Sequence, residues 1–150
     1  MVDSVSQEAR SRNMAAIKSK DTKPEVFLRK LLFSEGYRYR KNVSYIPGHP
    51  DLYLAKYNTA IFVNGCFWHR HPGCKYAYMP KSHIEFWKKK FQANTARDEK
   101  VQILLREKGI KSIVVWECTI KRMMRDETEQ ERILSQIEKT LSSDFVFLQL

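Results

Sequence analysis

The sequence predicts an α/β (α+β) fold in which helices flank a central mixed β-sheet of about four strands. The prediction comes from strand patterns that alternate with helix patterns along the chain, and from the Pro, Gly and Asn turn signals between them. The length of 150 residues and a hydrophobic content of 43% suit one globular domain, 1–150, with its own core. No internal repeat or linker divides the chain.

Two helices are predicted before the first strand. Residues 6–18 have the pattern of a polar, basic helix with a small apolar face that includes Met14 and Ile17. The letters TKPE at 22–25 fit a capping box with proline in the first turn, and Gly36 marks the C-terminal end of that second helix.

Three strand segments follow. Residues 37–45 alternate enough to form a strand that ends in the turn 46–50. A hairpin is then predicted, with strands near 51–56 and 59–64 joined at Tyr57-Asn58.

The second half begins with a predicted long helix. The letters SHIE at 82–85 predict a second capping box, and the helix would run to about Lys108 with a break near Asn94. A buried strand, KSIVVWEC, is predicted at 111–118, and an amphipathic helix at 126–142. The last residues, FVFLQL, suit a terminal strand or a docked tail.

The net charge of +10 is concentrated in the first two thirds of the chain. Residues 1–100 carry 19 Lys and Arg against 9 Asp and Glu, whereas residues 101–150 carry 8 of each. A polyanionic partner is indicated, with nucleic acid ahead of an acidic membrane surface, and a simple solubility charge is the alternative. No apolar run approaches the ~20 residues that span a bilayer, and no signal peptide is recognisable, so a cytoplasmic location is expected.

The cysteines indicate a metal site. Cys66, His71 and Cys74 lie in one loop, and Cys118 lies at the end of a predicted strand. Three thiolates and one imidazole suit a closed, structural zinc site, although His69 could take the place of His71. The alternative is three buried free cysteines.

Two aromatic residues, Phe67 and Trp68, lie inside this loop. If zinc makes the loop rigid, their rings would project and could stack on bases or wedge between base steps, which is easiest where base pairing is already poor. Packing into the core is the alternative.

A candidate catalytic set consists of Asp51, His69 and Asp98. Asp51 follows a proline at the start of the hairpin, where metal-dependent nucleases often place an acid, but the next strand offers only Phe62-Val63-Asn64 and so has neither the second acid nor the lysine of the usual signature. His69 could act as a base oriented by Asp98. The alternatives are a turn carboxylate, a surface histidine and a helix ion pair.

These residues also carry a family resemblance. NMAAIKSKDTKPE, PGHPDLYL, FVNGCFWHRHPGC, EFWKKKFQANTARD and VVWEC resemble, in order and spacing, the very short patch repair (Vsr) DNA mismatch endonucleases. The resemblance covers about residues 10–118. It implies a restriction-endonuclease-like fold with a structural zinc site, and an N-terminal arm, 1–20, that contacts DNA.

The resemblance implies roles for the active-site residues. Asp51 would be the principal Mg²⁺ ligand and the backbone carbonyl of Val63 a second one. His69 would be the general base, with Asp98 as its partner, and Glu25 matches an acidic position near the active site.

It also implies binding roles. Some relatives carry a histidine at the place of Asn64, which cannot act as an acid or base at neutral pH. The matched residues are the zinc ligands Cys66, His71, Cys74 and Cys118, the wedging aromatics Phe67, Trp68 and Trp87, and the minor-groove residues Met14 and Ile17.

The implied reaction is a Mg²⁺-dependent nick in double-stranded DNA on the 5′ side of the thymine in a T:G mismatch, which arises when 5-methylcytosine deaminates. The resemblance further implies a monomer, no membrane partner, and a functional link to a cytosine-5 DNA methyltransferase and to repair proteins. The alternative function is a non-catalytic zinc module that binds distorted DNA.

Overall fold

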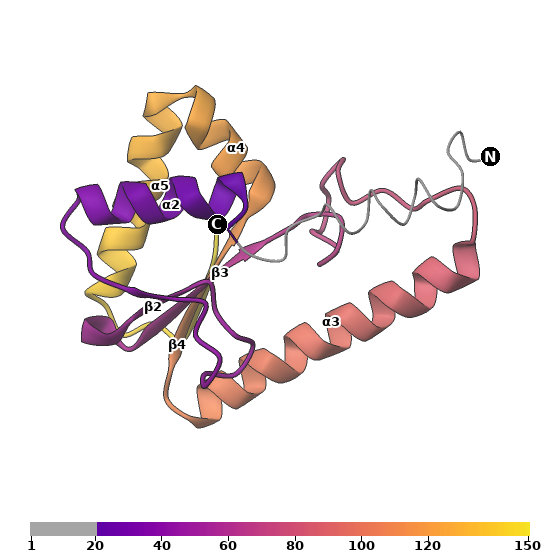
Figure 1. Ribbon diagram of the computed structural model, residues 1–150, viewed down its shortest axis with the longest axis horizontal. Helices are drawn as coiled ribbons and strands as arrows, with labels where there is room; N and C mark the ends of the chain where they lie inside the picture. Colours follow the sequence, from indigo (N-terminus) through magenta and orange to yellow (C-terminus); the bar gives the residue numbers. More distant parts are fainter. Residues whose placement is uncertain (1–20) are drawn as a thin grey trace.

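The computed structural model describes residues 21–150, and these form one mixed, five-stranded sheet (Figure 1). The strands lie in the order β1-β2-β3-β4-β5; β1, β2 and β3 pair antiparallel, and β3, β4 and β5 pair parallel. The prediction of a mixed sheet flanked by helices is confirmed, with one more strand than the four expected. The strand bounds are β1 Arg40–Lys41, β2 Leu52–Leu54, β3 Thr59–Asn64, β4 Lys111–Trp116 and β5 Phe147–Gln149.

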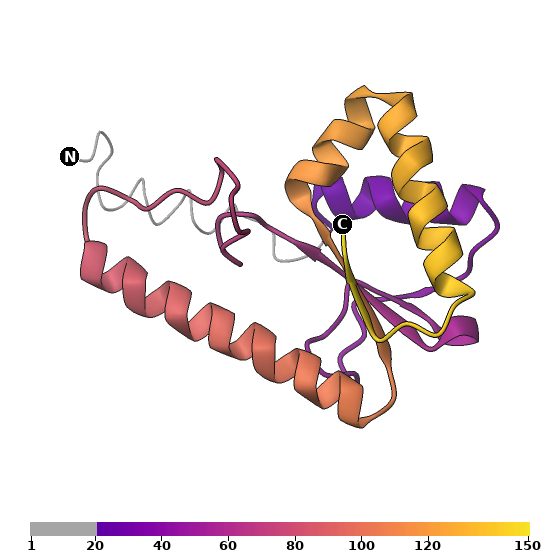
Figure 2. The ribbon, with the colours of Figure 1, turned by 180° about the vertical axis from the view of Figure 1, so that it is seen from behind.

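The helices divide between the two faces of the sheet. Three of them, α2 (Lys23–Ser34), α4 (Glu117–Arg125) and α5 (Glu127–Leu141), pack on one face. The long α3 (Ile84–Glu107) meets the opposite face only near its C-terminal end and extends away from the sheet (Figure 2). Among residues 21–150, no helix has the length and hydropathy needed to cross a membrane.

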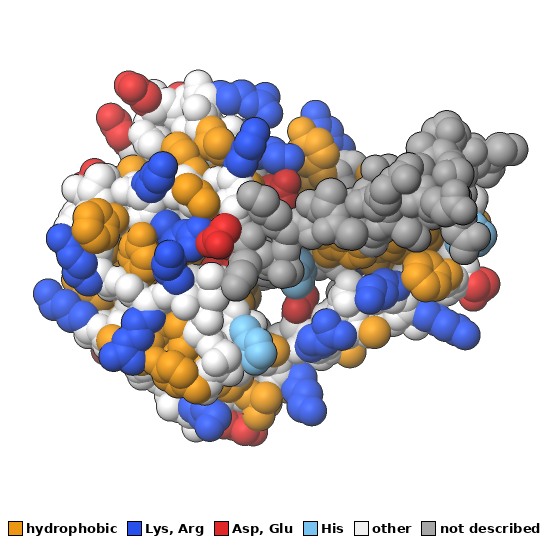
Figure 3. All heavy atoms as spheres, viewed as in Figure 1, with side chains coloured by type: hydrophobic (Ala, Val, Ile, Leu, Met, Phe, Trp, Pro, Cys, Tyr) orange, Lys and Arg blue, Asp and Glu red, His pale blue; other side chains and the backbone are white. Residues whose placement is uncertain are grey.

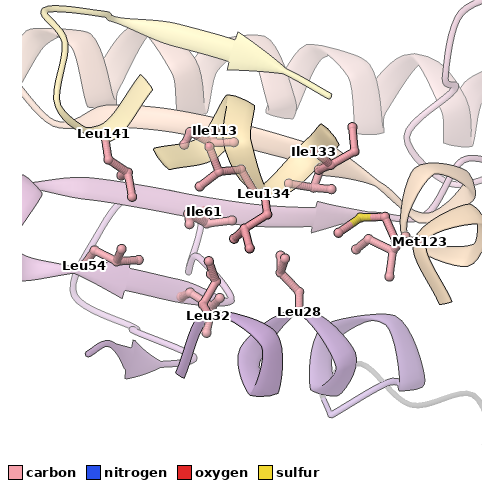
Figure 4. Close-up of a cluster of buried hydrophobic side chains, with 13 residues drawn as sticks. Leu28, Leu32, Leu54, Ile61, Ile113, Met123, Ile133, Leu134 and Leu141 are labelled. Atoms are coloured by element: carbon pink, nitrogen blue, oxygen red, sulfur yellow. The ribbon is translucent and has the colours of Figure 1, made fainter. Parts of the chain in front are cut away.

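The main core lies between the sheet and the three-helix layer (Figure 4). Neighbouring residues of a strand point to opposite faces, so Ile61 enters this core whereas Phe62 enters the smaller cluster beneath α3. Burial of branched aliphatic side chains therefore holds α2, α4 and α5 against the sheet. Fully buried members include Leu28, Leu32, Leu54, Ile61, Ile113 and Ile137.

The first capping box is largely confirmed. Oγ1 of Thr22 accepts a hydrogen bond from the N–H of Glu25 at 3.4 Å. The Glu25 carboxylate accepts from the N–H of Asp21, at 2.9 Å, instead of from that of Thr22. Both contacts anchor the start of α2, where the predicted active-site acid is located.

The second capping box was a wrong prediction. His83, the residue before α3, has a left-handed backbone with φ of 55° and makes no capping hydrogen bond through its side chain. The predicted break near Asn94 is also absent, because α3 is continuous from Ile84 to Glu107.

The C-terminal third contains a helix that was not predicted. β4 ends at Trp116, which pairs with Asn64, the last residue of β3, and the chain then turns directly into α4. Cys118 accordingly lies in the first turn of α4 and not at the end of a strand. The predicted helix at 126–142 corresponds to α5, and the terminal strand to β5. The predicted helix at 6–18 lies outside the described residues.

Candidate active site and metal centre

The four predicted zinc ligands converge at one place. The ligand atoms of Cys66, His71, Cys74 and Cys118 all lie within 4.8 Å of one another. Local backbone hydrogen bonds shape the loop, including His71 N–H to the Cys66 carbonyl at 3.0 Å. The Sγ atom of Cys118 lies 3.5 Å from Nδ1 of His71. The predicted set of three cysteines and one histidine is thereby brought together, and His69 is not part of it.

The electrostatics of the cluster suit a cation. Burial raises the pKa of the Cys66 thiol to about 12, so its thiolate form is disfavoured in the absence of a positive charge. Burial lowers the pKa of His71, and Arg122 adds to this effect, which keeps the imidazole neutral and able to donate a lone pair. The His71 ring also stacks on Trp116, with centroids 4.2 Å apart, which fixes its orientation. This donor set fits zinc in a tetrahedral, closed site.

Asp51 lies at the start of β2, next to Glu25 from α2. Its Oδ2 accepts a 2.6 Å hydrogen bond from the N–H of Val63 on the neighbouring strand. Burial raises the pKa of Asp51 to about 7; the Val63 hydrogen bond opposes this, and the Glu25 carboxyl group, which shares a hydrogen bond with Asp51, raises it further. Two carboxyl groups in a shielded place fit a hard cation such as Mg²⁺, which would relieve their repulsion.

The turn that precedes Asp51 requires glycine at position 48. Gly48 has φ of 83°, and a Cβ atom there would come within 2.6 Å of the Val101 side chain and 2.9 Å of the Phe62 ring. The turn before Asp51 therefore packs directly against α3 and β3, which fixes the direction from which the carboxylate enters the site.

His69 and Asp98 form the predicted pair. Nδ1 of His69 lies 2.7 Å from Oδ2 of Asp98 on α3, and both side chains are about one third exposed. This contact leaves Nε2 of His69 available to a substrate. The charge of His69 also acts on Asp51 and lowers its pKa, so the two predicted catalytic groups are neighbours.

Another contact from α3 supports this arrangement. The buried side chain of Asn94 donates a 3.1 Å hydrogen bond to the carbonyl of Trp68, the residue before His69. Asn94 and Asp98 are one helical turn apart and so reach the same segment of the loop.

A cavity of about 730 Å³ adjoins the His69–Asp98 pair between α3 and the sheet. Its walls combine apolar side chains with polar ones, among them Asn64, His69, Arg97, Asp98 and Trp116. Asn64 therefore lies beside the pair, in a position where its amide can hydrogen-bond but cannot transfer a proton at neutral pH.

The predicted wedge residues form an aromatic cluster instead of projecting singly. Phe67, Trp68 and Trp87 are each half-buried. The Phe67 ring is central, with its centroid 5.2 Å from Trp68, 5.5 Å from Trp87 and 5.2 Å from Phe91. These rings therefore pack against one another and are also partly exposed, so each of the two alternatives, projection and core packing, holds in part. Met14 and Ile17 lie outside the described residues.

The outer layer of this aromatic cluster is exposed and was not singled out from sequence. Tyr78 is 62% exposed and lies 5.1 Å from Phe67; Phe86 is 60% exposed and lies 5.3 Å from Trp87. Lys88, an exposed residue of α3, directly follows Trp87 in the sequence. Figure 3 shows further Lys and Arg side chains along this helix. Exposed aromatic rings bordered by positive charge suit a nucleic-acid surface.

The geometry of these side chains indicates a class of enzyme. A carboxylate pair beside a histidine–carboxylate pair, on a basic α/β fold that also carries a cysteine-rich metal site, is the equipment of a nuclease that cleaves phosphodiester bonds.

Comparison with known proteins gives the family. A family model described as DNA mismatch endonuclease Vsr matches residues 2–75. The type II nicking enzyme V.NmeAIP of Neisseria meningitidis is 43% identical over 92% of this chain and 98% of its own length. V.XorIIP of Xanthomonas oryzae, also a type II nicking enzyme, is 39% identical over 89% and 98%. The DNA mismatch endonuclease Vsr of Escherichia coli is 36% identical over 89% and 86%.

The chain belongs to the Vsr DNA mismatch endonuclease family. It is a DNA-nicking endonuclease, which confirms the predicted class of enzyme and sets aside the non-catalytic zinc module.

Proposed function

We propose that this enzyme nicks one strand of duplex DNA on the 5′ side of the thymine in a T:G mismatch and so initiates very short patch repair. The observation that carries the proposal is the placement of Asp51 and Glu25 next to the His69–Asp98 pair, beside a cluster of aromatic rings. The name of the E. coli relative supports the mismatch as the target.

The carboxylates of Asp51 and Glu25 and the backbone carbonyl of Val63 are the groups proposed to hold Mg²⁺. When bound, the ion supplies positive charge that stabilises the scissile phosphate and the leaving oxygen. The hydrogen bond from the N–H of Val63 turns the Asp51 carboxylate toward β3, which keeps the proposed ligands together.

His69 is the proposed general base. With Nδ1 donating to Asp98, Nε2 carries a lone pair that accepts a proton from the attacking water. Cleavage of the P–O3′ bond then leaves 5′-phosphate and 3′-hydroxyl ends. Asp98 stabilises the imidazolium that forms and fixes the orientation of the ring. Asn64 takes no part in proton transfer.

The zinc site is proposed to be structural. Cys66, His71, Cys74 and Cys118 would together supply the four ligands that a structural zinc ion takes, which would leave no position for water or substrate. Its effect is to tie the loop that carries Phe67, Trp68 and His69 to the first turn of α4. A zinc-dependent hydrolase at this site is therefore disfavoured.

The aromatic side chains Phe67, Trp68 and Trp87 are proposed to enter the duplex beside the mismatch. Unstacking a base step costs a few kcal/mol and is cheapest where the pair is already weak, which gives a preference for mismatched DNA. Met14 and Ile17 in the arm 1–20 are proposed to approach from the minor groove. A monomer, and a functional link to a cytosine-5 DNA methyltransferase and repair proteins, complete the proposal.

The deciding experiment is a nicking assay on paired duplexes that differ only in T:G against C:G, with several flanking sequences, with and without Mg²⁺. We expect a nick 5′ of the thymine in the mismatched duplex alone, and only with Mg²⁺. Equal nicking of both duplexes would refute the mismatch specificity. Full activity after Mg²⁺ is withdrawn would refute the metal role of Asp51.

A further inference from the structure

Arg70 lies between His69 and His71 in sequence, and its side chain hydrogen-bonds to the backbone of the loop that carries all three residues. Its guanidinium donates three hydrogen bonds to backbone carbonyls: Nη1 to Phe67 and to Tyr78, each at 3.1 Å, and Nη2 to Ala77 at 2.7 Å. These acceptors lie at two ends of the loop, about ten residues apart in sequence. The planar fork of arginine can reach them together, which a lysine ammonium cannot do with the same geometry.

The same guanidinium connects the loop to α3. Its central carbon lies 3.8 Å from the centroid of the Phe91 ring, a buried residue of α3, and 5.6 Å from that of Phe67. A cation above an aromatic face is attracted by the ring, more strongly where water is excluded. Arg70 thus contacts both the centre of the aromatic cluster and the helix that supports it.

The backbone at Arg70 is consistent with this role. Its φ of 54° lies in the left-handed region, which is uncommon for a residue with a long side chain. Such a conformation persists where surrounding contacts determine it, and it directs the side chain inward between Phe67 and Phe91.

We propose that Arg70 is a positioning residue for the nicking reaction. It holds Phe67 and Trp68 against α3, so that the aromatic cluster meets a distorted base pair while His69, the adjacent residue, faces the phosphate. The link to the mismatch rests on the proposed function; the bracing of the cluster does not.

A direct contact between Arg70 and a DNA phosphate is the rival explanation, and the two make opposite predictions for lysine. A phosphate contact needs charge, so Arg70→Lys would retain most activity and Arg70→Met would reduce the salt dependence of DNA binding by about one counterion. A positioning role needs the planar guanidinium group, which reaches several carbonyls at once, so Arg70→Lys would fail nearly as badly as Arg70→Met.

The experiment compares full-length Arg70→Met, Arg70→Lys and the exposed control Arg125→Met on α4. Three properties are measured: zinc content, acrylamide quenching of tryptophan fluorescence, and nicking of T:G and matched duplexes at low and saturating DNA. Because Trp116 is buried, quenching reports mainly on Trp68 and Trp87.

We expect both Arg70 variants to retain zinc, to show faster quenching, and to lose at least about tenfold in nicking of the mismatch at low DNA, the effect of one lost charged hydrogen bond. The control should match wild type.

Three results would overturn the proposal that Arg70 positions the aromatic cluster. They are unchanged quenching in Arg70→Met, restoration by Arg70→Lys, and loss of zinc together with the fold, which would make Arg70 a general folding residue. If wild type itself fails to distinguish T:G from matched DNA, the proposed mismatch specificity is wrong, and quenching and general nicking still decide the role of Arg70.

Discussion

The two faces of the sheet are held together by different forces. The face under α2, α4 and α5 is closed by aliphatic side chains with almost no exposure. The face toward α3 has a smaller buried cluster, and α3 leaves the sheet after meeting it (Figure 2). There the loop is held by directional contacts, namely the Asn94 amide, the His69–Asp98 pair and the Arg70 guanidinium, and it carries three of the four clustered Cys and His side chains that suit zinc.

This difference separates stability from activity. Aliphatic burial is non-directional and contributes most of the free energy of folding, whereas the directional contacts fix a few side chains in place at a modest net gain. Substitutions in the first face should therefore change how much protein is folded. Substitutions in the second face should change what the folded protein does.

Asp51→Asn should produce the largest effect, and the effects on activity and stability should be opposite. Nicking should fall to background, because the charge proposed to hold Mg²⁺ is lost. Because the pKa of Asp51 is raised from 3.8 to about 7 in the folded state, the ionised carboxylate destabilises the folded protein, fully so above about pH 7, and this penalty disappears only below about pH 4, where the group becomes protonated in the unfolded chain as well.

The stability measurement follows from that sign. Without added Mg²⁺, Asp51→Asn should have a higher Tm than wild type at pH 8, and the two Tm values should converge below about pH 4. The exposed Asp144→Asn is the matched control and should change neither property. A lower Tm for Asp51→Asn at pH 8 would show that the carboxylate has a structural role there.

His69→Ala should reduce the nicking rate at saturating DNA by ~10²–10⁴-fold, the usual contribution of a general base, with little change in binding. Asp98→Asn should give a smaller loss, because the amide oxygen can still accept from Nδ1 but lacks the charge that stabilises imidazolium. The exposed His83→Ala is the control. Single-turnover nicking rates measure whether the loss is largest for His69→Ala, smaller for Asp98→Asn and absent for His83→Ala. An inactive His83→Ala would show that His69 is not the general base.

Much of this second face was predictable because function there depends on residue type. The three cysteines were identified by chemistry and spacing, which left His69 and His71 as alternatives for the fourth ligand, and the structure brings His71 together with the cysteines. The His69–Asp98 pair was likewise proposed from residue type, and the two side chains lie 2.7 Å apart. Only particular side chains can bind zinc or orient an imidazole, so the sequence retains a trace of them.

The contacts that were missed involve the backbone. Every residue has a carbonyl, so nothing in the letters shows that Arg70 would reach those of Phe67, Ala77 and Tyr78. The start of α4 was missed for a related reason. β4 stops at Trp116 because its partner strand stops at Asn64, and that limit is set by pairing and not by the apolar run itself.

Ile137→Ala should act on the first face alone. Ile137 is fully buried on α5, and a truncated side chain there should lower the free energy of unfolding by about 2–5 kcal/mol. Nicking per folded molecule should be unchanged. The control is Ile103→Ala, because Ile103 is 54% exposed on α3 and should cost little stability. Urea unfolding with single-turnover nicking measures both; a rate loss in folded Ile137→Ala would show that the faces are coupled.

Phe86→Ala should have the smallest effect, confined to the second face. The ring is 60% exposed and touches Trp87 edge-on, so its removal should leave Tm nearly unchanged. If the ring stacks on a base, binding to mismatched duplex should weaken by about 1–3 kcal/mol. Phe33→Ala on α2, where the ring is 53% exposed on the first face, is the matched control and should bind normally. Equal affinity in the two variants would limit the DNA-contacting surface to the half-buried rings, and the outer layer would then serve only to shield Phe67 and Trp87 from water.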